Sequence, residues 1–159
     1  MSDDTAFIFA EHPDHPGWHS WQLRDETRYN GFLGPLLVRR EGDKARVKML
    51  PEHKHSNLAN AVHGGTTLGF IDVALFGASR VFGLIEAGTA VTLDLSVQFI
   101  GAGRIGVDME AEVELLRETR RLLFLRGLVV QGDEKVAAFS GTVRKGSDAK
   151  QFPSVAGRG

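Results

Sequence analysis

The sequence contains no cysteine and no excess of positive charge. The lack of cysteine excludes disulfide bonds, thiolate nucleophiles and cysteine-ligated zinc, and it fits a reducing compartment. Nineteen Lys and Arg residues stand against 20 Asp and Glu residues, so the formal net charge is -1 and nothing global attracts nucleic acid or anionic lipid. We therefore expect a cytoplasmic protein with no nucleic-acid partner.

A long uninterrupted apolar segment is also missing. The first residues, MSDDTAFIF, begin acidic and lack the basic region and apolar core of a signal peptide, and the longest apolar stretch is interrupted by Asp72. We expect neither export nor membrane insertion. With 42% hydrophobic and 25% charged residues, 159 residues suffice for one domain with its own core.

Hydrophobic periodicity predicts one long helix that divides two groups of strands. Residues 64 to about 84 are apolar, lack proline and are too long for one strand, so we expect a mostly buried helix. Gly42 and Asp43 lie between the first two strand-like segments, where they suit a hairpin turn. The strand-like segments are residues 32–40, 44–50, 91–99, 107–115, 121–130 and 135–143.

The order of these elements predicts an α+β domain in which a curled antiparallel sheet packs against one helix. This domain spans residues 32–145. We expect residues 1–31 to form an arm, irregular or partly helical, that packs on the domain through Trp18 and Trp21. Residues 146–159 are small and polar, which predicts a flexible tail.

Two of the expected strands alternate between apolar and polar residues. In residues 91–99 the odd-numbered positions are apolar, and in residues 107–115 the odd-numbered positions are apolar while the even-numbered ones are acidic. Such alternation is typical of strands with one buried face. We therefore expect the odd-numbered residues of both strands on the buried face.

The segment GAGRIG, residues 101–106, matches the spelling of a dinucleotide-binding loop but lacks its context. Such a loop places a pyrophosphate at a helix amino terminus, whereas the residues after Gly106 alternate as a strand and provide no helix dipole. We expect Gly101, Gly103 and Gly106 to make a turn between two strands.

Six histidines fall in two groups, so a metal site has to be considered. No two of these histidines form a helical pair at i and i+4, and no acidic residue lies at a familiar ligand spacing from them. Exposed loops also commonly hold histidine without metal. We expect no bound metal. The two groups are His12, His15 and His19, and His53, His55 and His63.

The most unusual charge in the chain is Asp72, in the middle of the expected helix. A carboxylate in an apolar helix carries a desolvation cost unless it is paired, hydrogen-bonded or beside a wet cavity. On helical spacing Asp72 shares its face with Gly65, Gly69, Phe76 and Ser79. The two glycines either leave space for a pocket or allow close packing of the helix, and spacing alone favours neither.

The glycines at the start of the expected helix supply possible hydrogen-bond donors for a second part of the site. N–H groups in the first turn lack internal partners and lie at the positive end of the helix dipole, so Gly64 or Gly65 can bind a developing oxyanion. Gly64 and Asp72 are eight residues apart, however, or about 12 Å along a helix at ~1.5 Å per residue. One carbonyl group cannot easily contact both, so their cooperation requires Gly64 of one subunit opposite Asp72 of another, in a dimer with two equivalent sites.

These residues resemble the hotdog-fold acyl-CoA thioesterases, in particular the phenylacetate-pathway (PaaI-like) type and its mammalian relatives. The family pattern has an asparagine six residues before an H-G-G, an aspartate nine residues after that histidine, and a serine or threonine on the next strand. The resemblance covers residues 32 to 145 and implies a hotdog fold, with the sheet wrapped around one long central helix. The matching residues are Asn57, His63, Gly64, Gly65, Asp72 and Thr92.

The resemblance implies hydrolysis of an acyl-CoA or related thioester, with no cofactor because coenzyme A is part of the substrate. The N–H of Gly64 would polarise the thioester carbonyl, and Asp72 of the partner subunit would act as nucleophile or as general base on water. Asn57 and His63 would hold the thioester end, and Thr92 would position the water. A loop cap for Asn57 and an ordinary strand position for Thr92 are the alternatives.

Further substrate contacts follow from residue type. Gly65 and Phe76 would line the substrate site, although phenylalanine in this helix is equally compatible with the core. The phosphates of coenzyme A require cations near strand ends. The candidate cations are Arg120 and Arg121, together with Arg104, Arg144 and Lys145.

The expected assembly is a homodimer or a dimer of dimers. Two alternatives to hydrolysis remain open at this point. One is an acyl-thioester hydratase or dehydratase, although those enzymes usually pair a histidine with an acidic residue at other spacings. The other is a non-catalytic acyl-CoA-binding hotdog protein, in which the histidine-rich arm covers the pocket.

Overall fold

A computed structural model describes residues 6–86 and 89–146. The helices are α1 (Tyr29–Leu33), the short 3-10 helix η2 (His53–His55) and α2 (Gly64–Val81). The strands are β1 (Phe7–Glu11), β2 (His19–Leu23), β3 (Leu37–Glu41), β4 (Lys44–Met49), β5 (Val91–Phe99), β6 (Met109–Glu118), β7 (Leu122–Gln131) and β8 (Glu134–Arg144). Among the described residues, no helix is long and apolar enough to cross a membrane.

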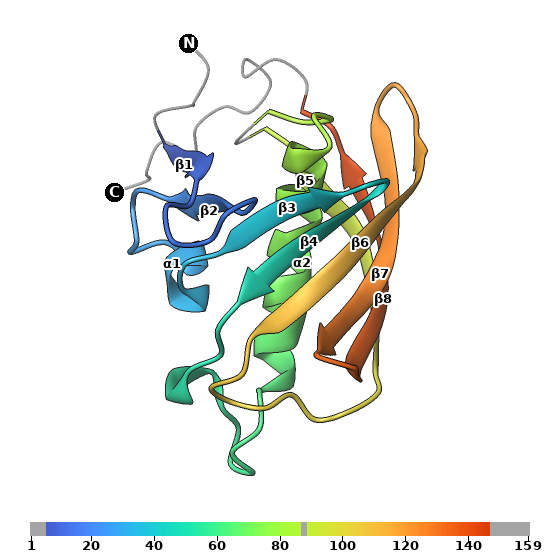
Figure 1. Ribbon diagram of the computed structural model, residues 1–159. Helices are drawn as coiled ribbons and strands as arrows, with labels where there is room; N and C mark the ends of the chain where they lie inside the picture. The colour runs from blue at the N-terminus through green and yellow to red at the C-terminus, as the bar shows by residue number, and fades with distance from the viewer. Residues whose placement is uncertain (1–5, 87–88, 147–159) are drawn as a thin grey trace, which may run out of the picture.

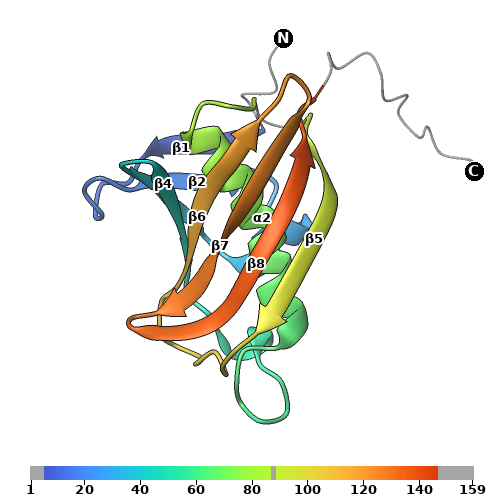
Figure 2. The same cartoon turned by 90° about the vertical axis from the view of Figure 1, so that its right-hand side faces the viewer.

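The strands form one antiparallel sheet that curls around α2 (Figures 1 and 2). Its 8 strands lie in the order β1-β2-β3-β4-β6-β7-β8-β5, so β1 and β5 are the two edges. The β3–β4 connection through Gly42, which has a φ of 61°, and Asp43 confirms the expected hairpin. The expected arrangement of one long helix against a curled antiparallel sheet is therefore confirmed.

Helix α2 supplies the centre of the core. Phe70, Ile71, Ala74 and Leu75 have no exposed surface and pack with apolar residues of β3, β4, β6, β7 and β8. The helix ends three residues before the predicted position, at Val81. The reason is a glycine-based cap, in which the N–H of Leu84 donates to the carbonyl oxygen of Ser79 and Gly83 adopts a φ of 73°.

The amino-terminal arm differs from the prediction of an irregular or partly helical segment. It forms the hairpin β1–β2, which pairs with β3 and so extends the main sheet. Trp18 and Trp21 are buried, with 6% and 5% of their surface exposed, as expected from their role in packing the arm. The strands were missed because each has only five residues, and the hairpin joins the sheet through the pairing of β2 with β3, a long-range contact that local periodicity does not report.

The first predicted strand also begins later than expected. Residues 32 and 33 belong to α1, Gly34 ends that helix with a φ of 87°, and β3 starts only at Leu37. The tail predicted for residues 146–159 lies outside the described residues except for Gly146.

Strand β5 departs from strict alternation because it contains a β-bulge. Its register with β8 shifts between Thr92 and Asp94, so Leu93 is 54% exposed although its position predicted burial. The bulge turns Thr92 toward α2, where its side chain contacts Asp72. In β6, by contrast, Met109, Ala111 and Val113 are buried as predicted.

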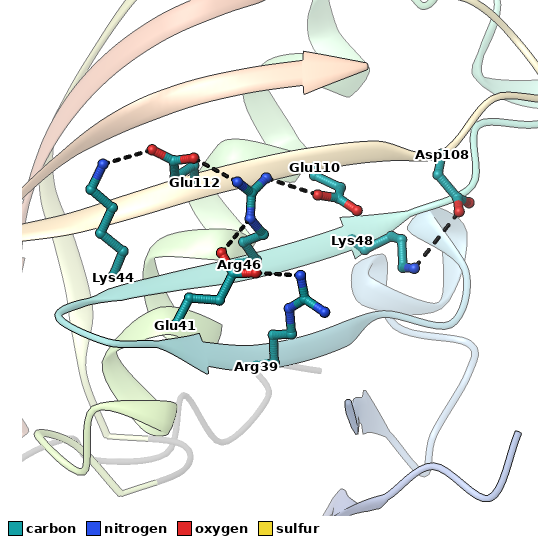
Figure 3. Close-up of polar contacts among 8 residues, drawn as sticks. All are labelled: Arg39, Glu41, Lys44, Arg46, Lys48, Asp108, Glu110 and Glu112. Atoms are coloured by element: carbon teal, nitrogen blue, oxygen red, sulfur yellow. Dashed lines mark hydrogen bonds and ion pairs between the residues drawn. The ribbon is translucent and has the colours of Figure 1, made fainter. Parts of the chain in front are cut away.

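The acidic face of β6 is paired with basic residues of β4 on the outside of the sheet (Figure 3). Arg46 lies at the centre, with guanidinium nitrogens 2.9 Å from Glu110 and 2.8 Å from Glu112. Glu41 of β3 bonds the same guanidinium at 2.6 Å, and this bond is the largest cause of a lowered pKa for Glu41. Charges of both signs therefore neutralise each other across three strands.

The segment GAGRIG is a loop that connects β5 to β6, as the sequence predicts. The buried side chain of Gln131, 1% exposed, accepts a hydrogen bond from the Arg104 N–H at 2.7 Å and donates to the carbonyl oxygens of Arg104 and Val107. No helix follows this loop. The geometry required for binding a pyrophosphate is therefore missing.

Candidate active site

Asp72 lies midway along α2 and is bonded to the neighbouring strand. The Thr92 hydroxyl donates a hydrogen bond to Asp72 Oδ1 at 2.6 Å. Asp72 is half-buried, and the other carboxylate oxygen has no hydrogen-bond donor among the described residues. One oxygen is thus held by Thr92, and the other is available to a water or a substrate atom.

Tyr29 of α1 approaches the same face of the helix, which the sequence did not indicate. Its hydroxyl lies over Gly69, one turn before Asp72, so closely that a Cβ at residue 69 would be 1.8 Å from the hydroxyl oxygen. The space beside Gly69 is therefore filled by Tyr29 rather than open. Partial burial raises the pKa of Tyr29 above its ordinary value of 10.0, and the negative charge of Asp72 raises the pKa further.

A pocket of about 230 Å³ opens beside Asp72. Helix α2 contributes Asp72, Val73, Phe76 and Arg80 to its wall, and the connection after the helix contributes Ile85, Glu86 and Ala90. Phe76, which the sequence proposed as a substrate contact, is thus next to the carboxylate. Gly65 is not, because it lies at the amino end of α2, two turns away.

The amino-terminal segment forms the opposite wall of this pocket. Phe7 of β1 and Trp21 and Leu23 of β2 supply apolar surface, and Asn30 of α1 adds one polar group. The wall facing Asp72 is therefore mostly apolar, which suits the hydrocarbon part of a ligand.

The amino end of α2 forms a second, separate group of residues. His63 is the N-cap, and its Nδ1 accepts a hydrogen bond from the Gly65 N–H at 2.8 Å. Gly64 is the first helical residue, and its N–H has no acceptor among the described residues. A Cβ at Gly64 would lie 3.5 Å from the ring of Phe99, at the far end of β5 from Thr92.

Asn57 belongs to the loop that precedes this helix end. Its Oδ1 accepts hydrogen bonds from the Ala59 N–H at 2.9 Å and the Ala61 N–H at 3.1 Å. The oxygen therefore caps the loop, which was the alternative considered from the sequence, while the side-chain NH2 group has no acceptor among the described residues.

His55 is a structural residue that sequence reasoning did not separate from the other histidines. It is completely buried, its Nδ1 accepts from the Glu52 N–H at 2.9 Å, and its Nε2 lies 2.6 Å from the carbonyl oxygen of Phe32. This pattern requires the neutral ring with its proton on Nε2. His55 thereby ties α1, which carries Tyr29, to the segment that leads into α2.

The structure does not bring all the predicted site residues together within one chain. Asp72 and Gly64 are held apart by the unbroken α2, at about 12 Å for eight residues. Arg120 and Arg121 are exposed in the β6–β7 turn, at the end of the sheet where β5 begins and opposite the end that contacts Gly64. Within the described ranges, no group of three or more His, Asp or Glu side chains is arranged to hold a metal ion.

Known proteins are similar to this chain in both sequence and fold. Residues 59–138 match the family model of the thioesterase superfamily. A Pseudomonas aeruginosa protein named as a candidate esterase, PA0474, is 29% identical over 111 residues, which cover 69% of this chain and 82% of that protein.

Solved structures of related proteins are similar to this chain in fold. A mutant of the phenylacetic acid degradation protein PaaI from Thermus thermophilus aligns with a TM-score of 0.61 and 28% identity, covering 72% of this chain and 96% of that chain. Mouse thioesterase superfamily member 2, at 17% identity, aligns with a TM-score of 0.62 over 74% of this chain and 87% of that chain, which is a likeness of fold. The hotdog fold expected from the sequence is therefore confirmed, and the chain belongs to the thioesterase superfamily.

Proposed function

We propose that this protein hydrolyses an acyl-CoA, or a closely related acyl thioester, to a free acid and a thiol. The observation that carries the proposal is the carboxylate of Asp72, bonded to Thr92 at 2.6 Å and placed beside an apolar pocket. A half-buried carboxylate with one free oxygen is a competent general base or nucleophile. Membership of the thioesterase superfamily supports a thioester as the bond that is cleaved.

The proposed site is completed by a second subunit in a homodimer or a dimer of dimers. Because Gly64 and Asp72 of one chain are too far apart for one carbonyl group, Gly64 of one subunit faces Asp72 of the other. Strand β5, which carries Thr92, is a free sheet edge with exposed Leu93 and Phe99, at 54% and 52%. Such an edge is a natural surface for a second copy of the chain.

In the proposed reaction, Asp72 removes a proton from a water that the Thr92 hydroxyl holds. The water oxygen attacks the thioester carbon, and the carbonyl oxygen becomes an oxyanion that accepts a hydrogen bond from the Gly64 N–H of the second subunit. The C–S bond then breaks and the proton on Asp72 passes to the departing thiolate. In the alternative order Asp72 attacks first and water cleaves the resulting anhydride.

Three further residues support this site. His63 fixes the first turn of α2 through its bond to Gly65, so the Gly64 N–H has a defined direction. The NH2 group of Asn57, which has no acceptor among the described residues, is proposed to contact the thioester end. Arg120 and Arg121, at the end of the sheet where β5 begins, are proposed to contact coenzyme A phosphates.

The test is thiol release from a panel of aryl, short-chain and long-chain acyl-CoAs. A thiol-reactive dye reports only released coenzyme A, because the protein has no cysteine. Asp72→Asn should lower kcat by about a hundredfold or more, since it removes the base but keeps the shape. The matched control is Asp133→Asn, an exposed carboxylate in the turn between β7 and β8, which should keep full turnover.

Two outcomes would contradict the proposal. Full turnover in folded Asp72→Asn would exclude this residue as base or nucleophile. Binding of acyl-CoA without thiol release by the unchanged protein would identify a binding protein instead of a hydrolase.

A further inference from the structure

The hairpin β1–β2 contributes to the pocket beside Asp72 although it lies outside the part of the chain that matches the family. The match begins at residue 59, whereas β1 and β2 end at Glu11 and Leu23. Figure 1 shows both strands at the level of the carboxyl-terminal half of α2, the half that follows Asp72. The hairpin thus reaches the proposed site from residues that precede the family match.

Two directly paired residues of the hairpin form part of the pocket wall. Phe7 of β1 is opposite Leu23 of β2 in the strand register, and both side chains are half-buried and line the pocket. Val73 and Phe76 of α2 line the same pocket. The distance between the hairpin and the helix therefore determines how much apolar volume is available next to Asp72.

This wall is fixed in place rather than loosely attached. Trp21 is 5% exposed, stacks on Phe7 with ring centroids 5.9 Å apart, and donates its backbone N–H to the carbonyl oxygen of Leu36 at 2.9 Å. It also packs on α2 at Gly77, where a Cβ would lie 3.2 Å from the indole ring. Because Trp21 anchors the hairpin to the helix, the wall cannot retreat easily to admit a larger ligand.

The volume of this open pocket sets a scale for the part of the ligand that lies next to Asp72. The pocket measures about 230 Å³. An apolar cavity of ~150 Å³ holds one benzene molecule, so the volume next to Asp72 suits a compact group somewhat larger than a single ring.

We propose that the β1–β2 hairpin limits the size of the acyl group, with Phe7 and Leu23 as the specificity-determining residues. The apolar end of the acyl group lies between these two side chains and Phe76, while its thioester carbon lies at Asp72. This inference rests on the proposed thioesterase function.

The test compares kcat/KM for hexanoyl-CoA and decanoyl-CoA in variants of the full-length protein. Phe7→Ala removes a ring from the wall and should raise the decanoyl-to-hexanoyl ratio about tenfold, which is the lower end of what methylene-sized differences in an apolar pocket are worth. Leu23→Phe adds bulk at the paired position and should lower the same ratio. Opposite shifts from two substitutions cannot be produced by a general loss of stability.

Ile8→Ala is the matched control, because Ile8 follows Phe7 in β1 and points to the other face of the hairpin. It removes a similar apolar side chain, and it should leave the ratio unchanged. If Phe7→Ala and Leu23→Phe change the ratio no more than Ile8→Ala does, the hairpin does not select the acyl group and the inference is wrong.

A failure of the proposed thioesterase function is distinguishable from a failure of this inference. In that case no variant releases thiol from either substrate, and calorimetric titration with the same two acyl-CoAs replaces the rate measurement. A dissociation-constant ratio that moves in the same opposite directions supports the hairpin as a size filter for a bound acyl group. A ratio that stays fixed, or no binding at all, overturns it.

Discussion

Tyr29 connects the amino-terminal segment to the carboxylate of the proposed site. Its hydroxyl occupies the place of a side chain at Gly69, so the glycine is required by this contact. Glycine inside a helix costs about 0.5–1 kcal/mol relative to alanine. The glycine that lets the Tyr29 phenol approach Asp72 therefore lowers the stability of the helix at this position.

The position of Tyr29 makes it an optical reporter of the charge on Asp72. It is the only tyrosine in the chain, so the near-ultraviolet absorbance of phenolate follows this residue alone. We expect a Tyr29 pKa above 10.0 in the folded protein, because burial and then the charge of Asp72 both disfavour the phenolate. Asp72→Asn should lower the Tyr29 pKa, but not fully to 10.0, because the burial remains.

The raised pKa of Tyr29 makes the free energy of unfolding depend on pH in a definite direction. The folded state holds the phenol proton of Tyr29 more tightly than the unfolded state does. The contribution of Tyr29 to the free energy of unfolding is therefore complete below pH 10.0 and is lost as the pH rises through the raised pKa. The control is Asp94→Asn, which should leave the titration unchanged. An identical Tyr29 titration in the Asp72→Asn and unchanged proteins would show that the phenol does not sense this carboxylate.

Some residues of the site were visible in the sequence and others were not. Asp72 stood out because a carboxylate in an apolar helix is costly, and Thr92 was named through the family spacing. Tyr29 could not be found in this way, since its contact with Gly69 depends on where α1 docks. His55 looked like any loop histidine until its two ring bonds to Glu52 and Phe32 were seen.

At the scale of elements, α2 presents one backbone donor at its first residue. His63 occupies the N-cap with φ -61° and ψ 136°, and its ring satisfies Gly65 but not Gly64. This leaves the Gly64 N–H at the positive end of the helix dipole, where an oxyanion is best stabilised.

Substituting Gly64 can remove this donor without breaking the helix. Proline has no N–H and is favoured at the first helical position, and the ψ of His63 is already one that a following proline allows. Gly64→Pro should lower kcat by about 10²–10³, the usual cost of losing an oxyanion donor, with little change in the urea midpoint of unfolding.

Gly64→Ala is the matched control for this donor. It keeps the N–H, and its Cβ would meet the Phe99 ring at an ordinary contact distance of 3.5 Å, so turnover should be largely retained. Equal kcat in the proline and alanine variants would exclude the Gly64 N–H as the oxyanion donor.

The elements themselves were predictable to different degrees. The long apolar run made α2 easy to recognise, and the alternation in β6 gave the correct buried face. The same rule failed at Leu93 of β5, because a bulge at Thr92 reverses the face of the next residue, whereas Leu95 and Val97 are half-buried as predicted. Bulges leave no simple mark in hydrophobic periodicity. Strands β1 and β2 are stabilised by the rest of the sheet, which no local pattern reveals.

For the whole molecule, the sheet has a charged outer face and two different edges. The ion pairs of β3, β4 and β6 keep the outer face polar (Figure 3). Figure 2 shows β5 at the edge beside α2, whereas the other edge is formed by β1 of the arm. The β5 edge carries Thr92 and exposed apolar side chains, so a second copy that pairs there would bring two proposed sites together.

A cis–trans test with mixed dimers distinguishes a site shared between subunits from a site within one subunit. Gly64→Pro and Asp72→Asn chains are produced together with two different affinity tags, and the mixed dimer is isolated. If Gly64 of one subunit serves Asp72 of the other, this dimer keeps one intact site and about half of the normal turnover. The reference is a mixed dimer of an unchanged chain and a chain with both substitutions, which then has no intact site and should be inactive. Activity in the reference dimer but not in the first one would place Gly64 and Asp72 in the same subunit's site.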